Sequence, residues 1–372
     1  MSLLKVGITG QSGFIGYHLT QYLRLHMDEV EIVPFDPSYF QDQDNLMRFV
    51  QQCDAVVHLA AMNRGSEDEV YATNIRLVEQ LIRALEDAGH APHVIFSSST
   101  QEERDNAYGR SKREGARLLA AWAERNNARY TSLVIPNVFG PFGRPFYNSV
   151  VATFCHQLTH HQEPEIKVDA SLPLIYVQDL AREIFEVIRG AYDLPAVCLD
   201  ATAERKVSDI LARLQEFKGR YLDQHIIPDL NGPFDTALFN TFRSFIESDH
   251  FPVYPEVHTD DRGYLTEVLK ERSGGQVFFS VTKPGITRGN HFHMRKIERF
   301  CVIQGEALIR LRRIGADQTI EYHVHGSKPS FVDIPIYYTH NITNIGTTDV
   351  LTLFWTNELF DPADPDTFYE GV

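Results

Sequence analysis

The stretch LLKVGITGQSGFIG, residues 3–16, decides the fold of the first half of the chain. Its apolar opening, residues 3–9, is typical of a buried strand and leads directly into Gly10, Gly13 and Gly16. In a strand-turn-helix unit such glycines permit a tight turn, let backbone N–H groups approach a pyrophosphate, and let the helix pack close to the strand. The helix that begins near Phe14 and Ile15 favours negative charge at its N-terminus. These five residues are candidate dinucleotide-binding residues; the alternative is a glycine-rich turn without a ligand.

Strand and helix patterns alternate through the rest of the first half. Apolar runs at residues 31–35, 55–59, 94–96 and 133–135 predict buried strands, and amphipathic patterns at 70–88 and 108–126 predict helices. This alternation is typical of a parallel sheet covered on both faces. We therefore predict an α/β, Rossmann-like doubly wound domain in residues 1–245.

The character of the sequence changes near residue 250. From there the chain consists of short β-rich runs with few helical periods, at residues 264–269, 277–281, 298–303, 307–311, 320–325 and 349–355. Such a series predicts an all-β barrel or a double-sheet jelly roll, which we assign to residues 246–372.

The bulk composition excludes several classes of function. A length of 372 residues favours two domains, and a net charge of −15 argues against a binder of nucleic acid or anionic membranes. The four cysteines are scattered, which is typical of reduced thiols in the cytoplasm. The sequence opens on no signal-peptide pattern and contains no apolar run of membrane-spanning length. We expect a cytoplasmic protein that binds neither nucleic acid nor membranes.

Tyr108 and Lys112 stand four residues apart at the start of a predicted helix, so both side chains lie on one face. A nearby ammonium favours the phenolate and lowers the pKa of the tyrosine toward the working pH. Tyr108 could then exchange a proton with a carbinol oxygen while a nicotinamide exchanges hydride, and Lys112 would also hold the cofactor ribose. The serines at 97–99 could hydrogen-bond the same oxygen. The alternatives are a surface Tyr-Lys pair and a polar strand end.

The choice between NADH and NADPH depends on Asp36, at the end of the second predicted strand. A carboxylate there accepts hydrogen bonds from the ribose 2′-hydroxyl and repels a 2′-phosphate, which favours NADH. The alternative is an ordinary turn residue before Pro37.

These motifs together resemble the extended short-chain dehydrogenase/reductase family, over about the first 240 residues. The resemblance also rests on Val57-His58-Leu59-Ala60-Ala61, on Asn74, and on the substrate-side segment Pro136-Asn137-Val138-Phe139-Gly140-Pro141. It implies that NAD(P)H is the cofactor, that Leu59, Ala60 and Ala61 contact it, and that Ser99, Tyr108 and Lys112 form the catalytic triad. Eight residues separate Ser99 from Tyr108, fewer than is usual in this family, which leaves Ser97 and Ser98 open as alternatives.

A second constellation lies in the β-rich half. His291 and His293 are two apart on a predicted strand, so both point to the same face, and Glu298 and His340 come from neighbouring strands. With Gly285, Gly305, Pro335 and Asn344 they match the two cupin motifs. Three imidazoles and one carboxylate suit a single divalent metal, Zn²⁺, Fe²⁺, Mn²⁺ or Ni²⁺. The alternative is ordinary core and surface histidines.

The segments around the first cupin motif, Asp260-Asp261-Arg262-Gly263-Tyr264-Leu265-Thr266-Glu267 and Thr287-Arg288-Gly289-Asn290-His291, are similar to those of sugar-nucleotide cupins that epimerise 4-keto sugars. A metal there would polarise the ketone and stabilise the charge that forms when the adjacent proton leaves. Because this reaction needs a Lewis acid and no redox change, we expect zinc. Tyr337, Tyr338 and Glu267 are candidates for the base.

The chain as a whole resembles bifunctional capsular polysaccharide enzymes of UDP-N-acetyl-L-fucosamine synthesis. The similar stretches include Met62-Asn63-Arg64, Tyr147-Asn148-Ser149 and Lys283-Pro284-Gly285. The resemblance implies that the cupin epimerises C3 of a UDP-2-acetamido-2,6-dideoxy-4-hexulose and that the reductase then reduces C4, giving UDP-2-acetamido-2,6-dideoxy-L-talose. It also suggests a substrate role for Asn63, Arg64, Asn137, Tyr147 and Asn148.

Some features depart from that family or leave other readings open. The family is associated with NADPH, whereas Asp36 favours NADH, and Tyr337 replaces a glycine of the second cupin motif, where it would narrow the pocket mouth. The alternatives are a different UDP- or dTDP-4-keto-6-deoxy sugar, a cupin dioxygenase fused to a dehydrogenase, and a non-catalytic pair that senses cofactor and binds sugar. Symmetry base rates favour a homodimer.

Overall fold

The computed structural model describes residues 3–190, 194–260, 263–266, 268–269, 274–359 and 361–372. The chain forms two compact units, each with its own core. The first unit comprises residues 1–153 and 168–207, and the second comprises residues 154–167 and 208–372.

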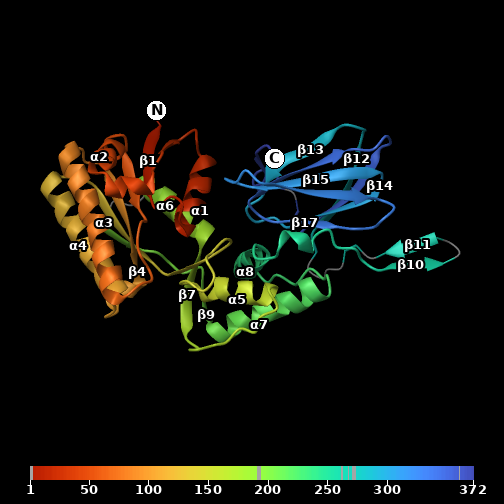
Figure 1. Cartoon of the computed structure of the whole chain (residues 1–372), viewed down its shortest axis with the longest axis horizontal. Coiled ribbons are helices and arrows are strands. Elements are labelled where there is room, and N and C mark those ends of the chain that lie inside the picture. Colours follow the sequence, from red (N-terminus) through yellow and green to blue (C-terminus); the bar gives the residue numbers. More distant parts are fainter. Residues whose placement is uncertain (1–2, 191–193, 261–262, 267, 270–273, 360) are drawn as a thin grey trace. The chain divides into compact units, whose positions relative to one another are not determined.

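The first unit is built on a parallel six-stranded sheet with the order β2-β1-β3-β4-β5-β8. Figure 1 labels β1 and β4 of this sheet. Its strands are β1 (Leu4–Thr9), β2 (Val30–Val33), β3 (Ala55–His58), β4 (His93–Ser99), β5 (Tyr130–Ile135) and β8 (Ala196–Cys198). The order reverses between β1 and β3, and such a switch point opens a crevice at the carboxyl ends of the strands. The predicted Rossmann-like fold is confirmed.

Helices cover both faces of this sheet, as the alternation of patterns predicts. One face is covered by α1 (Phe14–Arg24) and α6 (Val177–Ile188). The other is covered by α2 (Gln43–Gln51), α3 (Glu67–Ala88) and α4 (Ala107–Asn126). Helix α3 begins at a capping box between Ser66 and Glu69, which satisfies N–H groups at its first turn.

Shorter elements complete the first unit. A three-stranded sheet contains β6 (Asn137–Phe139), β7 (Ser171–Tyr176) and β9 (Ala203–Lys206). The 3₁₀ helices η1 (Pro37–Gln41) and η2 (Thr100–Glu103) follow β2 and β4. Strand β2 ends at Val33, earlier than predicted, before the proline at 34, which has no N–H for the ladder. Strand β4 is longer than predicted and includes all three serines.

The second unit combines helices with an antiparallel two-sheet jelly roll, so the predicted all-β fold is confirmed. One sheet has the order β12-β19-β14-β17 and the other β16-β15-β18-β13-β20. In chain order the strands are β12 (Gln276–Thr282), β13 (Thr287–Phe292), β14 (Glu298–Gln304), β15 (Glu306–Arg313), β16 (Thr319–His325), β17 (Val332–Ile334), β18 (Tyr338–Asn344), β19 (Val350–Thr356) and β20 (Phe368–Tyr369). A separate hairpin is formed by β10 (Val257–Asp260) and β11 (Gly263–Thr266).

The helices α7 (Val207–Phe217) and α8 (Pro233–Arg243), with the π-helical turn η3 (Lys218–Asp223) and the 3₁₀ turn η4 (Ser248–His250), precede the jelly roll. Helix α5 (Val150–Thr159) runs from the first unit into the second. On the jelly roll, the buried Arg299 guanidinium pairs with Asp333 at 2.7 Å, and Tyr221 of η3 donates to the same carboxylate. Arg243 of α8 donates to the Ile334 carbonyl at 2.6 Å.

These buried contacts place residues 208–245 in the same compact unit as the jelly roll. The predicted domain boundary after residue 245 stays a prediction. Among the described residues, no helix has both the length and the apolarity needed to cross a membrane.

Candidate functional site

The glycine turn has the geometry that a bound pyrophosphate requires. Gly10 has a φ of 75°, and a Cβ there would lie 2.9 Å from the Ala60 backbone nitrogen. A Cβ on Gly16 would lie 2.2 Å from the Gly10 carbonyl oxygen, so only glycine lets α1 approach the turn. Gly13 caps α1 without a side-chain hydrogen bond, which leaves the first N–H groups of the helix available to an anion.

A cavity of about 280 Å³ extends from this turn across the switch point between β1 and β3. Its walls contain cofactor candidates from α1 and from the loop after β3, the serines of β4, and both predicted catalytic residues of α4. The lining includes Phe14, Ile15, Leu59, Ala61, Asn63, Ser97, Ser98, Ser99, Tyr108, Lys112, Asn137 and Asn148. The structure therefore brings together residues that the sequence distributes over about 140 positions.

Lys112 lies at the bottom of this cavity with 3% of its surface exposed. Its Nζ atom donates to the Ser97 carbonyl oxygen at 2.7 Å and lies 5.6 Å from the centroid of the Tyr108 ring. Burial lowers the pKa of Lys112 to about 7, because an ammonium loses its hydration there.

The electrostatics of Tyr108 differ from the expectation. Burial, and after it the neighbouring Tyr147 phenol, raises the pKa of Tyr108 above its ordinary value, whereas the sequence argument expected Lys112 to lower it. The expectation was wrong for the protein alone, because desolvation dominates the pKa of this buried phenol. At neutral pH the Tyr108 side chain is therefore a phenol that can donate a proton.

The three serines differ in their hydrogen bonds. Ser97 donates its hydroxyl hydrogen to the His58 carbonyl oxygen at 3.0 Å, and Ser98 donates to a carboxylate oxygen of Glu102. The Ser99 hydroxyl accepts from the Gln101 N–H at 3.2 Å. Of these three serine hydroxyls, that of Ser99 alone accepts a hydrogen bond without donating one to another described residue.

Asp36 lies three residues beyond β2, where it is exposed and caps η1. Its carboxylate accepts from the Ser38 N–H at 2.8 Å, and hydrogen bonding to the Ser38 side chain and then to this N–H lowers the pKa of Asp36. The turn role that the sequence left open is thus present, and the carboxylate is ionised at neutral pH.

The substrate-side candidates surround the same cavity. Asn63, Asn137 and Asn148 line it, and the Tyr147 hydroxyl accepts from the Asn63 N–H at 3.4 Å. Arg64 donates to the Phe146 carbonyl oxygen at 2.6 Å. The sequence argument missed Arg144, whose guanidinium lies 5.1 Å from the centroid of the Tyr147 ring. No motif marks that residue, because its position depends on how the loop folds back.

In the jelly roll, ligand atoms of His291, His293, Glu298 and His340 all lie within 4.8 Å of one another. His291 of β13 pairs in register with His340 of β18, so both side chains share one face. A Glu298 carboxylate oxygen lies 2.9 Å from Nε2 of His293 and 3.2 Å from Nε2 of His340. These three buried atoms lie close together, but none of them makes a hydrogen bond of acceptable geometry. This donor set fits a divalent metal.

Neighbouring groups orient these imidazoles. Nδ1 of His293 donates to the Asp366 carbonyl oxygen at 2.5 Å, which leaves Nε2 directed at Glu298. Nδ1 of His340 lies 3.2 Å from the Tyr338 carbonyl oxygen. Such outer hydrogen bonds fix the tautomer and the orientation of metal-binding histidines.

Two members of the cluster have charges that suit a cation, whereas burial would lower the pKa of His293 but Glu298 raises it. Burial and the neighbouring imidazoles lower the pKa of His291 to about 3, so its ring is neutral. Burial alone would raise the pKa of Glu298, but His293 and His340 hold it well below its usual range. A neutral imidazole and an ionised carboxylate are the protonation states that bind a metal.

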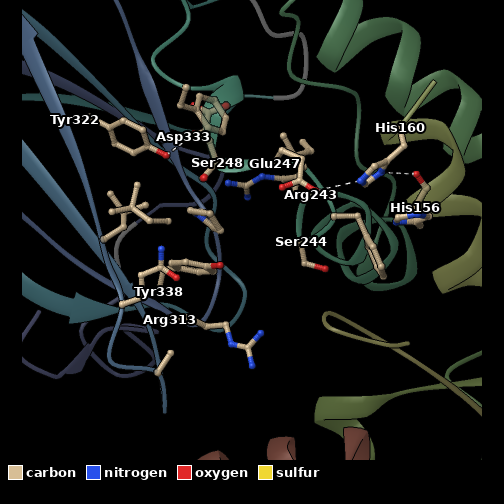
Figure 2. Close-up of a pocket in the computed structure, with 18 residues that line it drawn as sticks. His156, His160, Arg243, Ser244, Glu247, Ser248, Arg313, Tyr322, Asp333 and Tyr338 are labelled. Carbon is tan, nitrogen blue, oxygen red and sulfur yellow. Dashed lines mark hydrogen bonds and ion pairs between the residues drawn. The ribbon is translucent and has the colours of Figure 1, made fainter. Parts of the chain in front are cut away.

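The candidates for the base lie in different environments. Tyr337 is fully buried with a φ of 59°, so it adopts the left-handed backbone expected of the glycine it replaces. Its ring stacks on Phe292 in the core, and the expected narrowing of the pocket mouth stays a prediction. Tyr338 points into a cavity of about 450 Å³ within the second unit, beside Arg313 and Tyr322 (Figure 2). Glu267 lies outside the described residues.

Comparisons with known proteins place both halves of the chain. Residues 6–194 match the NAD dependent epimerase/dehydratase family, and residues 258–368 match a polysaccharide biosynthesis C-terminal domain. A UDP-2-acetamido-2,6-beta-L-arabino-hexul-4-ose reductase from Pseudomonas aeruginosa is 34% identical over 98% of this chain and 98% of its own.

Solved structures agree with this. The capsular polysaccharide assembling protein CapF from Staphylococcus aureus is 34% identical, with a TM-score of 0.64, over 99% of this chain and 100% of its own. RMD from Pseudomonas aeruginosa, solved with NADPH, is 20% identical, with a TM-score of 0.52, over 58% of this chain and 82% of its own. The latter likeness concerns the fold alone.

Proposed function

The chain belongs to the NAD dependent epimerase/dehydratase family through residues 6–194 and to the family of CapF over its full length, and on this premise we propose that it is a bifunctional sugar-nucleotide enzyme. Its jelly roll epimerises C3 of a UDP-2-acetamido-2,6-dideoxy-4-hexulose. Its first unit then reduces the C4 ketone, giving UDP-2-acetamido-2,6-dideoxy-L-talose for UDP-N-acetyl-L-fucosamine and surface polysaccharide. The observation that carries the reductase assignment is the cavity that joins the glycine turn to Tyr108 and Lys112.

In the reductase step, a bound nicotinamide supplies hydride to C4. Tyr108 donates its phenolic proton to the C4 oxygen, and the burial that raises its pKa keeps this proton available at neutral pH. The Lys112 ammonium, 5.6 Å from the Tyr108 ring centroid, stabilises the phenolate that remains. The hydrogen-bond pattern favours Ser99 as the hydroxyl that orients the ketone, because Ser97 and Ser98 donate elsewhere.

In the epimerase step, a bound divalent metal, which we propose to be zinc, would supply the Lewis acidity that the C4 ketone needs. His291, His293, Glu298 and His340 would hold it, and Asp366 and Tyr338 keep two of the imidazoles oriented through their carbonyl oxygens. Of the candidate bases that the structure describes, Tyr337 is fully buried, and Tyr338 lines a cavity that none of the four metal-binding candidates lines. Tyr337, Tyr338 and Glu267 therefore all stay candidates to remove the C3 proton.

The two epimers at a carbon beside a ketone are close in free energy, so reduction of that ketone fixes the product. This coupling gives a chemical reason for the fusion. The test is mass spectrometry and NMR of products formed from a panel of UDP- and dTDP-4-keto sugars, with NADH or NADPH. A C3-inverted, C4-reduced UDP-2-acetamido sugar supports the proposal. Turnover only of another keto sugar, an oxygen requirement, or no turnover at all contradicts it.

The cofactor, the assembly and the compartment belong to the same proposal. The ionised Asp36 carboxylate favours NADH, because it repels a 2′-phosphate. A kcat/KM for NADPH far above that for NADH would contradict this role. We further propose that the protein is cytoplasmic and that it forms a homodimer. Sedimentation of the purified protein tests the homodimer.

A further inference from the structure

Two arginines lie beside one tyrosine near the reductase cavity. The guanidinium carbons of Arg64 and Arg144 lie 5.8 Å and 5.1 Å from the centroid of the Tyr147 ring. Arg64 follows Asn63, and Tyr147 precedes Asn148, and both asparagines line the cavity that contains Tyr108. Both arginines are exposed, so an incoming ligand can reach them.

The loop that carries Arg144 is held in one conformation. His18 lies 2.8 Å from the Pro141 carbonyl oxygen before the arginine, and the Phe146 N–H donates to Thr153 Oγ1 at 3.0 Å after it. Phe142 and Phe146 have φ values of 65° and 54°, in the left-handed region that such side chains rarely adopt. Backbone strain of this kind persists where the surrounding structure enforces it, commonly at ligand-binding loops.

The charge of this pair contrasts with that of the chain. The net charge is −15, so an anionic ligand is repelled unless cations gather locally. No ion pair among the described residues uses Arg64 or Arg144. Arg110, which also belongs to the first unit, pairs with Glu67 and Asp105 instead. The two guanidinium groups at Tyr147 are therefore not neutralised by carboxylates of the described chain.

From these observations we infer that Arg64 and Arg144 form a clamp for the diphosphate of the sugar nucleotide that is reduced at Tyr108. This inference rests on the proposed function and extends it to Arg144. In a hexopyranose, C1 lies opposite C4 across the ring, so a diphosphate at C1 points away from the reacting ketone. Tyr147 is near enough to Tyr108 to raise its pKa, and both guanidinium groups lie beside the Tyr147 ring. Guanidinium groups bind phosphate oxygens with two parallel hydrogen bonds, which favours arginine in this role.

A diphosphate could also come from the dinucleotide. The glycine turn and the N-terminus of α1 already offer that pyrophosphate backbone N–H groups. The clamp is therefore assigned to the sugar nucleotide, and separate titrations with UDP and with NADPH distinguish the two sources.

The experiment measures the affinity of the full-length protein for UDP, for uridine and for NADPH by calorimetry. Arg144→Ala and Arg64→Ala should each weaken UDP binding about tenfold, the loss expected for one charge-assisted phosphate contact. Binding of uridine and NADPH should stay unchanged. Arg83→Ala is the control, because Arg83 is a 74% exposed arginine of the same unit that forms an ion pair with Asp87. It should bind UDP as the unmodified protein does.

Two further measurements separate recognition from loop stability. Higher salt should weaken UDP binding in the unmodified protein more than in Arg144→Ala, because screening acts on the charge that the variant lacks. Arg144→Lys should recover part of the affinity. Unchanged UDP affinity in folded Arg64→Ala and Arg144→Ala overturns the clamp, even if the hexulose is reduced. Weakened UDP binding without reduction of the hexulose by the unmodified protein supports the clamp and overturns the proposed reaction.

Discussion

The Lys112 ammonium donates to the Ser97 carbonyl oxygen at 2.7 Å, at the end of the strand that leads to the reductase cavity. This bond fixes the ammonium beneath Tyr108 without supplying a counter-charge. Burial consequently lowers the pKa of Lys112 to about 7, and its pH dependence becomes measurable in the neutral range.

We expect kcat/KM for reduction to fall as the pH rises through about 7. A lowered lysine pKa means that Lys112 is charged below this pH and neutral above it, and only the charged form stabilises the Tyr108 phenolate. The profile of kcat/KM reports groups of the free enzyme, so it is the appropriate measurement. Tyr108 keeps its proton throughout the range because its own pKa is raised. A flat profile between pH 6 and pH 9 would contradict this role for Lys112.

Gly16→Ala should weaken NADPH and NADH binding at least tenfold and lower the free energy of unfolding by about 1–3 kcal/mol. The added Cβ would lie 2.2 Å from the Gly10 carbonyl oxygen, so the turn and α1 must move apart. Gly219→Ala is the control, because no atom lies within 4 Å of its Cβ position. Fluorescence titration and thermal unfolding measure both quantities. Normal cofactor affinity in Gly16→Ala would refute the close packing at the turn.

Asp333→Asn should lower the free energy of unfolding by about 3–5 kcal/mol, because it leaves the Arg299 guanidinium buried without its carboxylate. Arg299 and Asp333 are only 3% and 1% exposed along their side chains. The matched control is Glu321→Gln, whose pair with Arg310 is largely exposed and contributes about 0–1 kcal/mol. Denaturant unfolding compares the two variants, and equal losses would contradict the buried role of Asp333.

His293→Ala and His340→Ala should each abolish stoichiometric metal binding, measured by elemental analysis of the purified protein. Each removes one of three imidazoles that converge with Glu298. His325→Ala serves as the control, because His325 is an exposed residue of β16. Chelation of the unmodified protein should stop proton exchange at C3 while dinucleotide binding persists. A metal-free protein with full exchange would leave the four residues without a catalytic role.

The parts of both sites that follow from local spacing could be predicted from the sequence. His291 and His293 share a face because side chains along a strand alternate between its two faces. Tyr108 and Lys112 share a face because residues four apart in a helix lie about one turn apart. The glycine turn could be predicted because Gly10 and Gly16 serve backbone contacts that no other residue permits.

The remaining features depend on distant chain segments. The sign of the Tyr108 pKa shift follows from burial, which spacing does not reveal. His293 is oriented by Asp366, 73 residues away, and Arg144 reaches Tyr147 only because its loop folds back. The core position of Tyr337 likewise depends on its contact with Phe292 of β13, which the sequence alone does not reveal.

The central claim is that two separate sites divide the reaction, and Tyr108→Phe tests it most directly. The variant removes the proton donor of the reductase while leaving the metal ligands of the second unit unchanged. The purified variant is incubated with the UDP-4-hexulose and NAD(P)H in deuterium oxide, and NMR follows C3 while absorbance follows the cofactor. The account predicts deuterium at C3 at the rate of the unmodified enzyme, with no oxidation of NAD(P)H. Loss of exchange in a folded variant, or continued oxidation of the cofactor, would contradict it.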